Sequence, residues 1–360
     1  MVLENIVNDD ERWCSLATRD TRLHYQTRDN ALAKALRSQI EWTTFGTTFN
    51  PFKRYLTIRP IVRWYNDRLM DRYIESEIDK SYARTKATGE KPSKSVLALA
   101  LQDYIQNSTS NTDTIHPAFK EALKANMRLF LFAGHDTTSS TLIFCYHHLS
   151  KHPSALAKMK SEHDQVFGKF ESADQLRETI LSRPQLLNSL PYTMAVIKET
   201  LRLNPPSSVI RKGKAGVYIT DDEGTRYPTE GCNVFALNPA LHRNPKYWPE
   251  PESFLPERWL ASPGDSLHPT EGSWRPFNAG QRGCIGQTLA VLELKIALVM
   301  TVREFSVRPA YEEWDERVGR KGMKTVNGER CYSAEVGGGG AHPADGYPCR
   351  VDVLSREAWE

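Results

Sequence analysis

The pattern of hydrophobic and polar positions changes character near residue 203. Before that point, apolar residues recur three and four apart among charged ones, which predicts amphipathic helices. From residue 204 onward, short apolar runs alternate with turn residues and prolines crowd 239–276, which predicts short strands and tight loops. One more long helix is expected at 287–301. We therefore predict an α+β fold, mainly α with a smaller β part, in a single domain with a helical half at 1–203 and a mixed half at 204–360.

The composition describes a chain that can bury a core, and it excludes several classes of protein. Of the 360 residues, 39% are hydrophobic and 25% are charged, which is typical of globular proteins. The net charge is only +3 and basic residues are mixed with acidic ones, so no nucleic acid partner is expected. Runs of about 18 apolar residues do not occur and the N-terminus is acidic, so we expect neither a transmembrane segment nor a secretory signal. The cysteines form no C-x-x-C pair, which favours free thiols in a reducing, intracellular compartment over disulfides or a zinc module.

The most informative segment is PFNAGQRGCIGQTLA at 276–290, where a cysteine stands among glycines just before an apolar helix. Glycine lets the backbone turn tightly and approach a ligand closely. The free N–H groups and the dipole at the start of the helix favour the thiolate form of Cys284. A thiolate held in this way is expected to be a metal ligand or a nucleophile.

Several chemistries could use this cysteine. A cysteine protease would require a histidine base with a matching local motif, and a zinc site would require three more ligands at ordered spacing; neither pattern is visible. The glycine spacing also differs from the dinucleotide motif G-x-G-x-x-G. Haem fits better, because its propionates give Arg282 an anionic partner and because Phe277 can cover the sulfur. The remaining alternative is a glycine loop around an incidental buried cysteine.

Phe277, Gly280, Arg282, Cys284 and Gly286 match all five fixed positions of F-x-x-G-x-R-x-C-x-G, and in this segment the sequence resembles the cytochrome P450 family. The resemblance implies a haem b cofactor, iron protoporphyrin IX, whose iron has Cys284 as its proximal ligand. It implies the cytochrome P450 fold lacking its N-terminal portion. The implied activity is that of a haem-thiolate monooxygenase, which inserts one oxygen atom from O2 into an organic substrate.

A second segment, MRLFLFAGHDTTSSTLIF, lies in a helix predicted over 117–148, about 50 Å long at 1.5 Å per residue. Glycine in a helix interior costs roughly 1 kcal/mol and the polar residues after it are indifferent helix formers, so a local backbone break is expected. The segment resembles the family pattern [AG]-G-x-[DE]-T-T. By that resemblance Gly134 and Thr137 face the sulfur of Cys284 across the haem, Thr137 donates a hydrogen bond there, and Asp136 feeds a proton relay. The alternative is a polar kink between packed helices.

A third group consists of Glu199 and Arg202, one turn apart in MAVIKETLRLNPP, and Arg258 in LPERWL. A helical Glu/Arg pair by itself is ordinarily a weak surface pair. The two segments resemble the family elements E-x-x-R and P-E-R-[FW], which implies a buried triad that locks the cysteine loop. By the same resemblance Arg211 is the strand arginine that binds the other haem propionate. The alternative for Arg211 is a solvated strand residue.

The resemblance spans about residues 40–355 and stops short of the family's N-terminal part. The W-x-x-x-R helix is not found: Trp13 and Trp42 have no arginine four residues later, and Gly46 takes that place after Trp42. Family members are anchored in the endoplasmic reticulum membrane, and this chain is expected to lack the anchor. Two hypotheses therefore stand beside the monooxygenase: a non-catalytic truncated remnant, with or without haem, and a haem-thiolate isomerase or dehydratase.

The expected partners follow from the motifs that are present and absent. Neither common nucleotide-binding loop occurs, so electrons are expected from a separate NADPH-cytochrome P450 reductase. The segment AHPADGYPCRV resembles fungal cytochrome P450s of secondary metabolism, which implies a small hydrophobic organic substrate. Retention of Asp136 and Thr137 favours monooxygenation over isomerisation or dehydration.

Overall fold

The computed structural model describes residues 31–42, 58–88, 95–107, 114–170, 172–335 and 340–354. Contacts divide the chain into two compact units, with the boundary inside one helix between Asp136 and Thr137. The first unit holds the described residues up to Asp136 together with Glu335, and the second holds Thr137–Ala334 and the segment from Gly340 onward. The prediction of a single domain stays a prediction. Trp13, Gly46 and the side chain of Trp42 lie outside the described residues.

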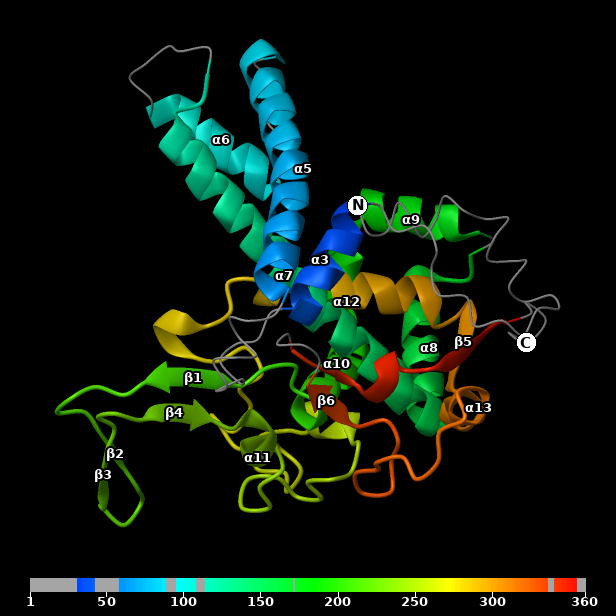
Figure 1. Cartoon of the computed structure of the whole chain (residues 1–360). Helices are drawn as coiled ribbons and strands as arrows, with labels where there is room; N and C mark the ends of the chain where they lie inside the picture. The colour runs from blue at the N-terminus through cyan, green and yellow to red at the C-terminus, as the bar shows by residue number, and fades with distance from the viewer. Residues whose placement is uncertain are drawn as a thin grey trace. The chain divides into compact units, whose positions relative to one another are not determined.

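The first unit is built from helices (Figure 1). They are α3 (Ala31–Trp42), α5 (Arg59–Thr88), α6 (Val96–Asn107) and the start of α7 (Pro117–Lys151). Met70, Ile74 and Ile78 of α5 are buried in one cluster with Leu101 of α6 and Leu123 of α7. Because residues four apart share one face of a helix, the three apolar side chains of α5 form a single stripe against their neighbours.

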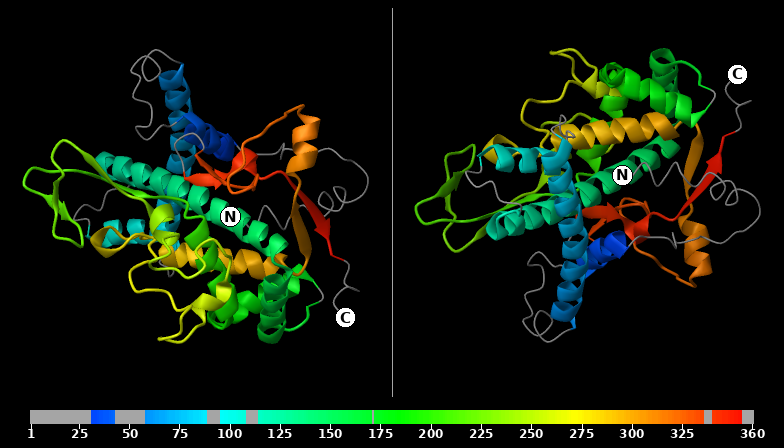
Figure 2. Two further views of the ribbon diagram at one scale, coloured as in Figure 1. Left: turned by 90° about the horizontal axis from the view of Figure 1, so that it is seen from below. Right: turned by 90° about the horizontal axis from the view of Figure 1, so that it is seen from above.

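The core of the second unit lies between the remainder of α7, α8 (Pro153–Phe167), α10 (Pro191–Leu203) and α12 (Gln287–Thr301). Leu149, Met159, Ile197 and Leu298, one from each of these helices, are buried in a common cluster. Figure 2 shows α12 running beside the second half of α7. Proline occupies the first turn of α8 and of α10, where its missing N–H leaves no helical hydrogen bond unmade.

Shorter elements complete the second unit. The helical ones are α9 (Ala173–Ser182), α11 (Asn238–His242), α13 (Tyr311–Arg317) and the 3₁₀ helices η1 (Pro184–Asn188), η2 (Pro256–Trp259), η3 (Gly280–Arg282) and η4 (Ala344–Gly346). In the described part of the chain, the strands pair two by two. The pairs are β1 (Val209–Lys212) with β4 (Asn233–Ala236), β2 (Tyr218–Thr220) with β3 (Arg226–Pro228), β5 (Phe305–Pro309) with β8 (Cys349–Val353), and β6 (Ser333–Glu335) with β7 (Ala341–Pro343). These are small sheets at the margin of a helical core.

The predicted fold class is confirmed as mainly helical with small sheets. The helix expected at 287–301 is α12, and the helix expected at 117–148 is α7, which ends three residues later at Lys151. The expected backbone break at Gly134 is wrong, since α7 continues through it. Packing of a long helix outweighs the roughly 1 kcal/mol that one glycine costs. Among the helices that the structure describes, none combines the length and the apolar character needed to cross a bilayer.

Candidate functional site

The loop that carries Cys284 is closed by its own backbone. The amide of Cys284 donates to the carbonyl of Phe277 at 2.8 Å, and the amide of Gly283 donates to the carbonyl of Gly280 at 2.9 Å. Gly280 has φ 70, a left-handed conformation that a side chain would strain. A Cβ on Gly283 would lie 3.2 Å from the Gly280 carbonyl oxygen, so this position is tight as well. The loop therefore holds the cysteine at a defined place just before α12.

The side chains around this cysteine are left uncovered. Cys284 is a free, exposed thiol, and the apolar side chains of Ile285 and Leu289 are 88% and 65% exposed. A Cβ on Gly286 would lie 3.8 Å from the sulfur, so the backbone of Gly286 runs beside the thiol. Exposed apolar side chains next to an exposed thiol form a surface that a bound molecule can cover. The surface offers one soft ligand atom in apolar surroundings.

The two arginines assigned to the haem propionates have no acidic partner among the described residues. Arg282 is exposed and forms no ion pair there. Arg211 lies on β1 opposite Val234, is exposed, and its guanidinium donates to the neighbouring carbonyl of Ile210 at 2.9 Å. Arg303 of the same unit, by contrast, pairs with a carboxylate at 2.9 Å. Arg211 and Arg282 are thus available to bind the carboxylates of a ligand.

Haem is a group that these residues fit. Within the described ranges, no three His, Cys, Asp or Glu side chains gather as a metal site. Cys284 offers one thiolate ligand, which suits a metal whose other ligands belong to a bound group. A porphyrin supplies such ligands through its ring nitrogens. Its apolar ring suits Ile285 and Leu289, and its two propionates suit Arg211 and Arg282.

The acid and alcohol predicted for proton delivery lie on α7 at the boundary between the units. Asp136 is buried and Thr137 is partly buried. The hydroxyl of Thr141 donates to the carbonyl of Thr137 at 2.9 Å, which adds a side-chain hydrogen bond to this turn. Gly134 is exposed, and apart from its two chain neighbours and the backbone of its own helix a Cβ there would meet no atom within 4 Å. The predicted position of Gly134 and Thr137 facing the sulfur of Cys284 stays a prediction, since Gly134 belongs to one unit and Cys284 to the other.

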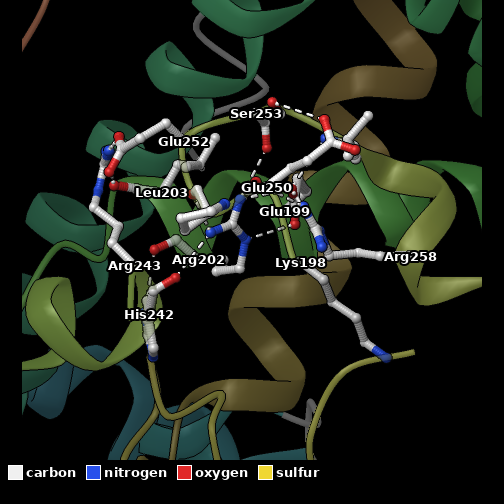
Figure 3. Close-up of polar contacts among 12 residues, drawn as sticks. Lys198, Glu199, Arg202, Leu203, His242, Arg243, Glu250, Glu252, Ser253 and Arg258 are labelled. Carbon is white, nitrogen blue, oxygen red and sulfur yellow. Dashed lines mark hydrogen bonds and ion pairs between the residues drawn. The ribbon is translucent and has the colours of Figure 1, made fainter. Parts of the chain in front are cut away.

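Glu199, Arg202 and Arg258 lie together, and all three side chains are fully buried (Figure 3). Glu199 accepts a bidentate pair of hydrogen bonds from Arg202, from Nε at 3.0 Å and from Nη2 at 2.9 Å. It also accepts one from Nε of Arg258 at 3.0 Å. Breaking a buried ion pair by removing one partner leaves an uncompensated charge away from water. The triad therefore depends on all three members being present.

Main-chain carbonyls accept further hydrogen bonds from both guanidinium groups. Arg202 donates to the carbonyls of His242, Pro251 and Ser253, and Arg258 donates to those of Pro249 and Glu250. These acceptors lie in the proline-rich stretch 239–276, which has little regular structure of its own. The two arginines thus donate hydrogen bonds to carbonyl groups that would be paired with main-chain amides in a helix or a sheet. The triad thus attaches an irregular segment to α10.

Three further residues of this cluster had no role in the sequence interpretation. The fully buried ring of Trp248 lies 5.1 Å from the guanidinium of Arg202, a cation–π contact, and Nε1 of Trp259 donates to Glu199 at 3.0 Å. His242 is also fully buried, and burial lowers its pKa to about 4. The one sequence signal was the position of Trp259 directly after a triad arginine. Spacing alone does not distinguish the other two from surface residues.

Comparison with known proteins identifies a family and shows how much of its relatives' length the chain spans. The model of the family described as Cytochrome P450 matches residues 20–328. Cytochrome P450 monooxygenase polC of Polytolypa hystricis is 40% identical over 347 residues, which cover 95% of this chain and 61% of that protein. Cytochrome P450 monooxygenase acrF of Aspergillus aculeatus is 32% identical over 348 residues, which cover 90% of this chain and 67% of that protein.

A solved structure supports the fold independently. The crystal structure of the cytochrome P450DA heme domain matches with a TM-score of 0.64 at 20% identity, over 92% of this chain and 62% of that one. The chain therefore spans about three fifths of the length of polC and of this solved structure. Since the family model covers most of the sequence and a 40% identical relative covers nearly all of it, the chain belongs to the cytochrome P450 family.

Proposed function

We propose that this chain binds haem b through Cys284 and acts as the haem-bearing part of a monooxygenase. The observation that carries the proposal is the exposed thiol of Cys284 beside the exposed apolar side chains of Ile285 and Leu289. In the haem-loaded protein, Arg211 and Arg282 would each bind a propionate. The chain's relatives polC and acrF, both named as monooxygenases, support the same assignment.

Each site residue has a chemical task in this proposal. When bound, haem supplies the reductive activation of O2 from which one oxygen atom enters a C–H or double bond of the substrate while the other leaves as water. Cys284 would hold the iron through its thiolate, and Phe277 would keep water from that bond. Gly286, whose backbone runs beside the sulfur, would leave room for the porphyrin, as Gly134 would on α7.

Protons and electrons reach the site from different sources. The buried carboxyl group of Asp136 would hold and release a proton, and the hydroxyl of Thr137 would pass it on at Oγ1. Electrons would come from NADPH through a separate cytochrome P450 reductase. The substrate would be a small hydrophobic organic molecule of fungal secondary metabolism.

Two alternatives stand beside the monooxygenase. The first is a chain that binds haem without turning over substrate, or that binds no haem. The second, isomerisation or dehydration on the same haem-thiolate centre, has less need of Asp136 and Thr137. Spectra and coupling measurements separate the three.

The ferrous–CO absorption spectrum tests the haem-thiolate assignment. The purified protein, supplied with haem, reduced and treated with CO, should show the absorption band of a thiolate-ligated haem. The Cys232→Ser variant, which replaces another exposed free cysteine, should show the same band. A band typical of haem without a thiolate ligand, or no haem uptake at all, would favour the remnant.

The coupling of NADPH consumption to product formation tests the monooxygenase reading. With reductase, NADPH and a panel of aromatic polyketides, Thr137→Ala should leave the ferrous–CO band unchanged and divert electrons from product to hydrogen peroxide. Thr179→Ala is the control, because Thr179 is also a threonine within a helix, and its hydroxyl donates to the carbonyl of Gln175 at 2.9 Å. Unchanged coupling in Thr137→Ala would make this residue a packing threonine, and the non-oxygenase reading would then be favoured.

A further inference from the structure

A row of aromatic rings connects the buried triad to the cysteine loop. The ring centroids of Trp248 and Trp259 are 5.7 Å apart, those of Trp259 and Trp274 are 5.4 Å apart, and those of Trp274 and Phe277 are 6.0 Å apart. The last two pairs meet edge to face, an arrangement that aromatic quadrupoles favour. The row begins beside the triad arginines and ends at the first residue of the cysteine motif.

Trp274 is held in this row on its polar side as well. Its indole Nε1 donates to the main-chain carbonyl of Lys198 at 3.2 Å, which ties it to α10 directly before Glu199. The ammonium of Lys198 lies 5.3 Å from the ring of Trp259 and 5.9 Å from the ring of Trp274. Figure 3 shows the Lys198 side chain extending away from Glu199 and Arg202. The cation therefore lies against both tryptophans and takes no part in the triad.

Phe277 transmits this arrangement to the cysteine. Its ring packs against Trp274, and its carbonyl accepts the amide of Cys284 at 2.8 Å. Asn278, the next residue, has φ 62, so the chain turns sharply immediately after Phe277. A shift of the Phe277 ring would thus move a carbonyl that fixes the backbone of the cysteine. Both Trp274 and Phe277 pack on the main hydrophobic cluster of the unit.

We propose that Trp274 is a positioning residue for the cysteine ligand: anchored to α10 through the Lys198 carbonyl, it sets Phe277 and through it the place of Cys284. The inference rests on the proposed haem-thiolate function. In this role the row of aromatic rings joins the buried triad to the cysteine loop, which is otherwise closed only by its own backbone. Trp274 acts through Phe277 and touches neither the substrate nor the sulfur in this role.

Two substitutions separate the hydrogen bond from the ring. Trp274→Phe keeps an aromatic ring and removes the indole N–H, whereas Trp274→Leu removes both. Trp314→Phe is the matched control, because Nε1 of Trp314 is buried without a hydrogen-bond partner, so its loss leaves no acceptor unpaired. Circular dichroism and haem content establish that each variant folds and loads.

The first readout is the ferrous–CO spectrum of the loaded variants. In Trp274→Phe, loss of one hydrogen bond should raise the ratio of non-thiolate to thiolate haem roughly fivefold. Trp274→Leu should raise it further, and Trp314→Phe should match the wild type. Since Trp274→Phe retains the packing, it decides the question even where Trp274→Leu fails to fold.

The second readout needs no haem. Site-resolved alkylation of the haem-free protein compares Cys284 with Cys232, an exposed cysteine that serves as the internal reference. Both Trp274 variants should change the Cys284 to Cys232 ratio, and Trp314→Phe should not. Absence of the thiolate band in the wild type would contradict the proposed function. The alkylation ratios would still test the role of Trp274. Wild-type values in both readouts for Trp274→Phe and Trp274→Leu would overturn the inference.

Discussion

The buried triad and the cysteine loop belong to one unit but differ in how completely the protein satisfies their chemical groups. Glu199 is saturated by hydrogen bonds from both arginines of the triad, from an indole and from a main-chain amide. Arg202 finds main-chain carbonyl acceptors for its three other protons, and Arg258 donates to two further carbonyls. Around Cys284 the thiol and its apolar neighbours are exposed, and Arg282 has no acidic partner among the described residues.

This difference separates a region whose charged groups find partners within the protein from a region whose groups are left available to a ligand. The triad buries its charges and so can be stable only if the protein supplies every partner. The cysteine loop leaves a thiol and a cation exposed, which costs little in water and suits a site that a ligand completes. Substitutions in the first region should therefore reduce the stability of the fold, and substitutions in the second should reduce ligand binding.

The largest effect is expected for Glu199→Ala. It would leave two guanidinium groups buried without a counter-charge, so the free energy of unfolding should fall by about 3–5 kcal/mol. Haem incorporation should be abolished with it. Urea unfolding followed by circular dichroism and the haem content of the purified variant measure the two effects. Glu223→Ala, which removes an exposed carboxylate, is the control. Normal haem content in Glu199→Ala would contradict the expected role of the triad.

A somewhat smaller effect is expected from His242, which borders the triad. Its Nδ1 lies 3.2 Å from the carbonyl of Arg202, and its Nε2 accepts the amide of Arg275 at 2.9 Å, so the neutral ring is the form that fits. Burial lowers the pKa of His242 to about 4 from its ordinary 6.5. Between these two pKa values, His242 is protonated in the unfolded chain and neutral in the folded chain. Stability is therefore lost as the pH falls from about 6.5 to about 4, by about 3 kcal/mol.

The His242 effect is measured as a difference. Denaturant unfolding at about pH 7 and about pH 4.5 should show a weaker pH dependence for His242→Gln than for the wild type. His268→Gln, at an exposed histidine, should retain the wild-type dependence. Equal pH dependence in all three proteins would show that His242 does not cause the loss of stability at low pH.

A moderate effect confined to the ligand is expected for Arg282→Gln. Loss of one charge-assisted hydrogen bond to a propionate, worth about 1.5–3 kcal/mol, should weaken haem binding by about tenfold or more. The free energy of unfolding of the haem-free protein should change by less than about 0.5 kcal/mol, because the side chain is exposed. Haem titration measures the first value, with Arg183→Gln as an exposed control. Unaltered haem affinity would place Arg282 among ordinary surface residues.

The smallest effect on stability is expected for Cys284→Ser. The side chain is exposed, so the unfolding free energy of the haem-free protein should stay within about 0.5 kcal/mol of the wild type. The ferrous–CO band of thiolate-ligated haem should nevertheless disappear. A loss of stability approaching that of Glu199→Ala would show that the cysteine loop is part of the core, which would contradict the contrast between the two regions.

Local features of the fold could be predicted where spacing alone decides them. The apolar run at 287–301 indicated α12, and the three-residue spacing of Glu199 and Arg202 placed both on one helix face. The break expected at Gly134 was wrong, because intrinsic helix propensity is a weak preference that packing overrides. Trp248 and His242 could not be predicted, since they lie in a proline-rich stretch without periodicity.

The sequence by itself determined the chemistry that is local in the chain. It specified a glycine loop that presents Cys284, a helix that starts directly after it, and the ion pair of Glu199 and Arg202 one helical turn apart. Such features depend on neighbours within about four residues, which the order of amino acids specifies directly. Only the tertiary structure decided that Arg202 finds its acceptors 40 to 51 residues away, and that Trp274 links α10 to the cysteine loop. These contacts join segments that come together only when the chain folds, so no spacing rule along the sequence contains them.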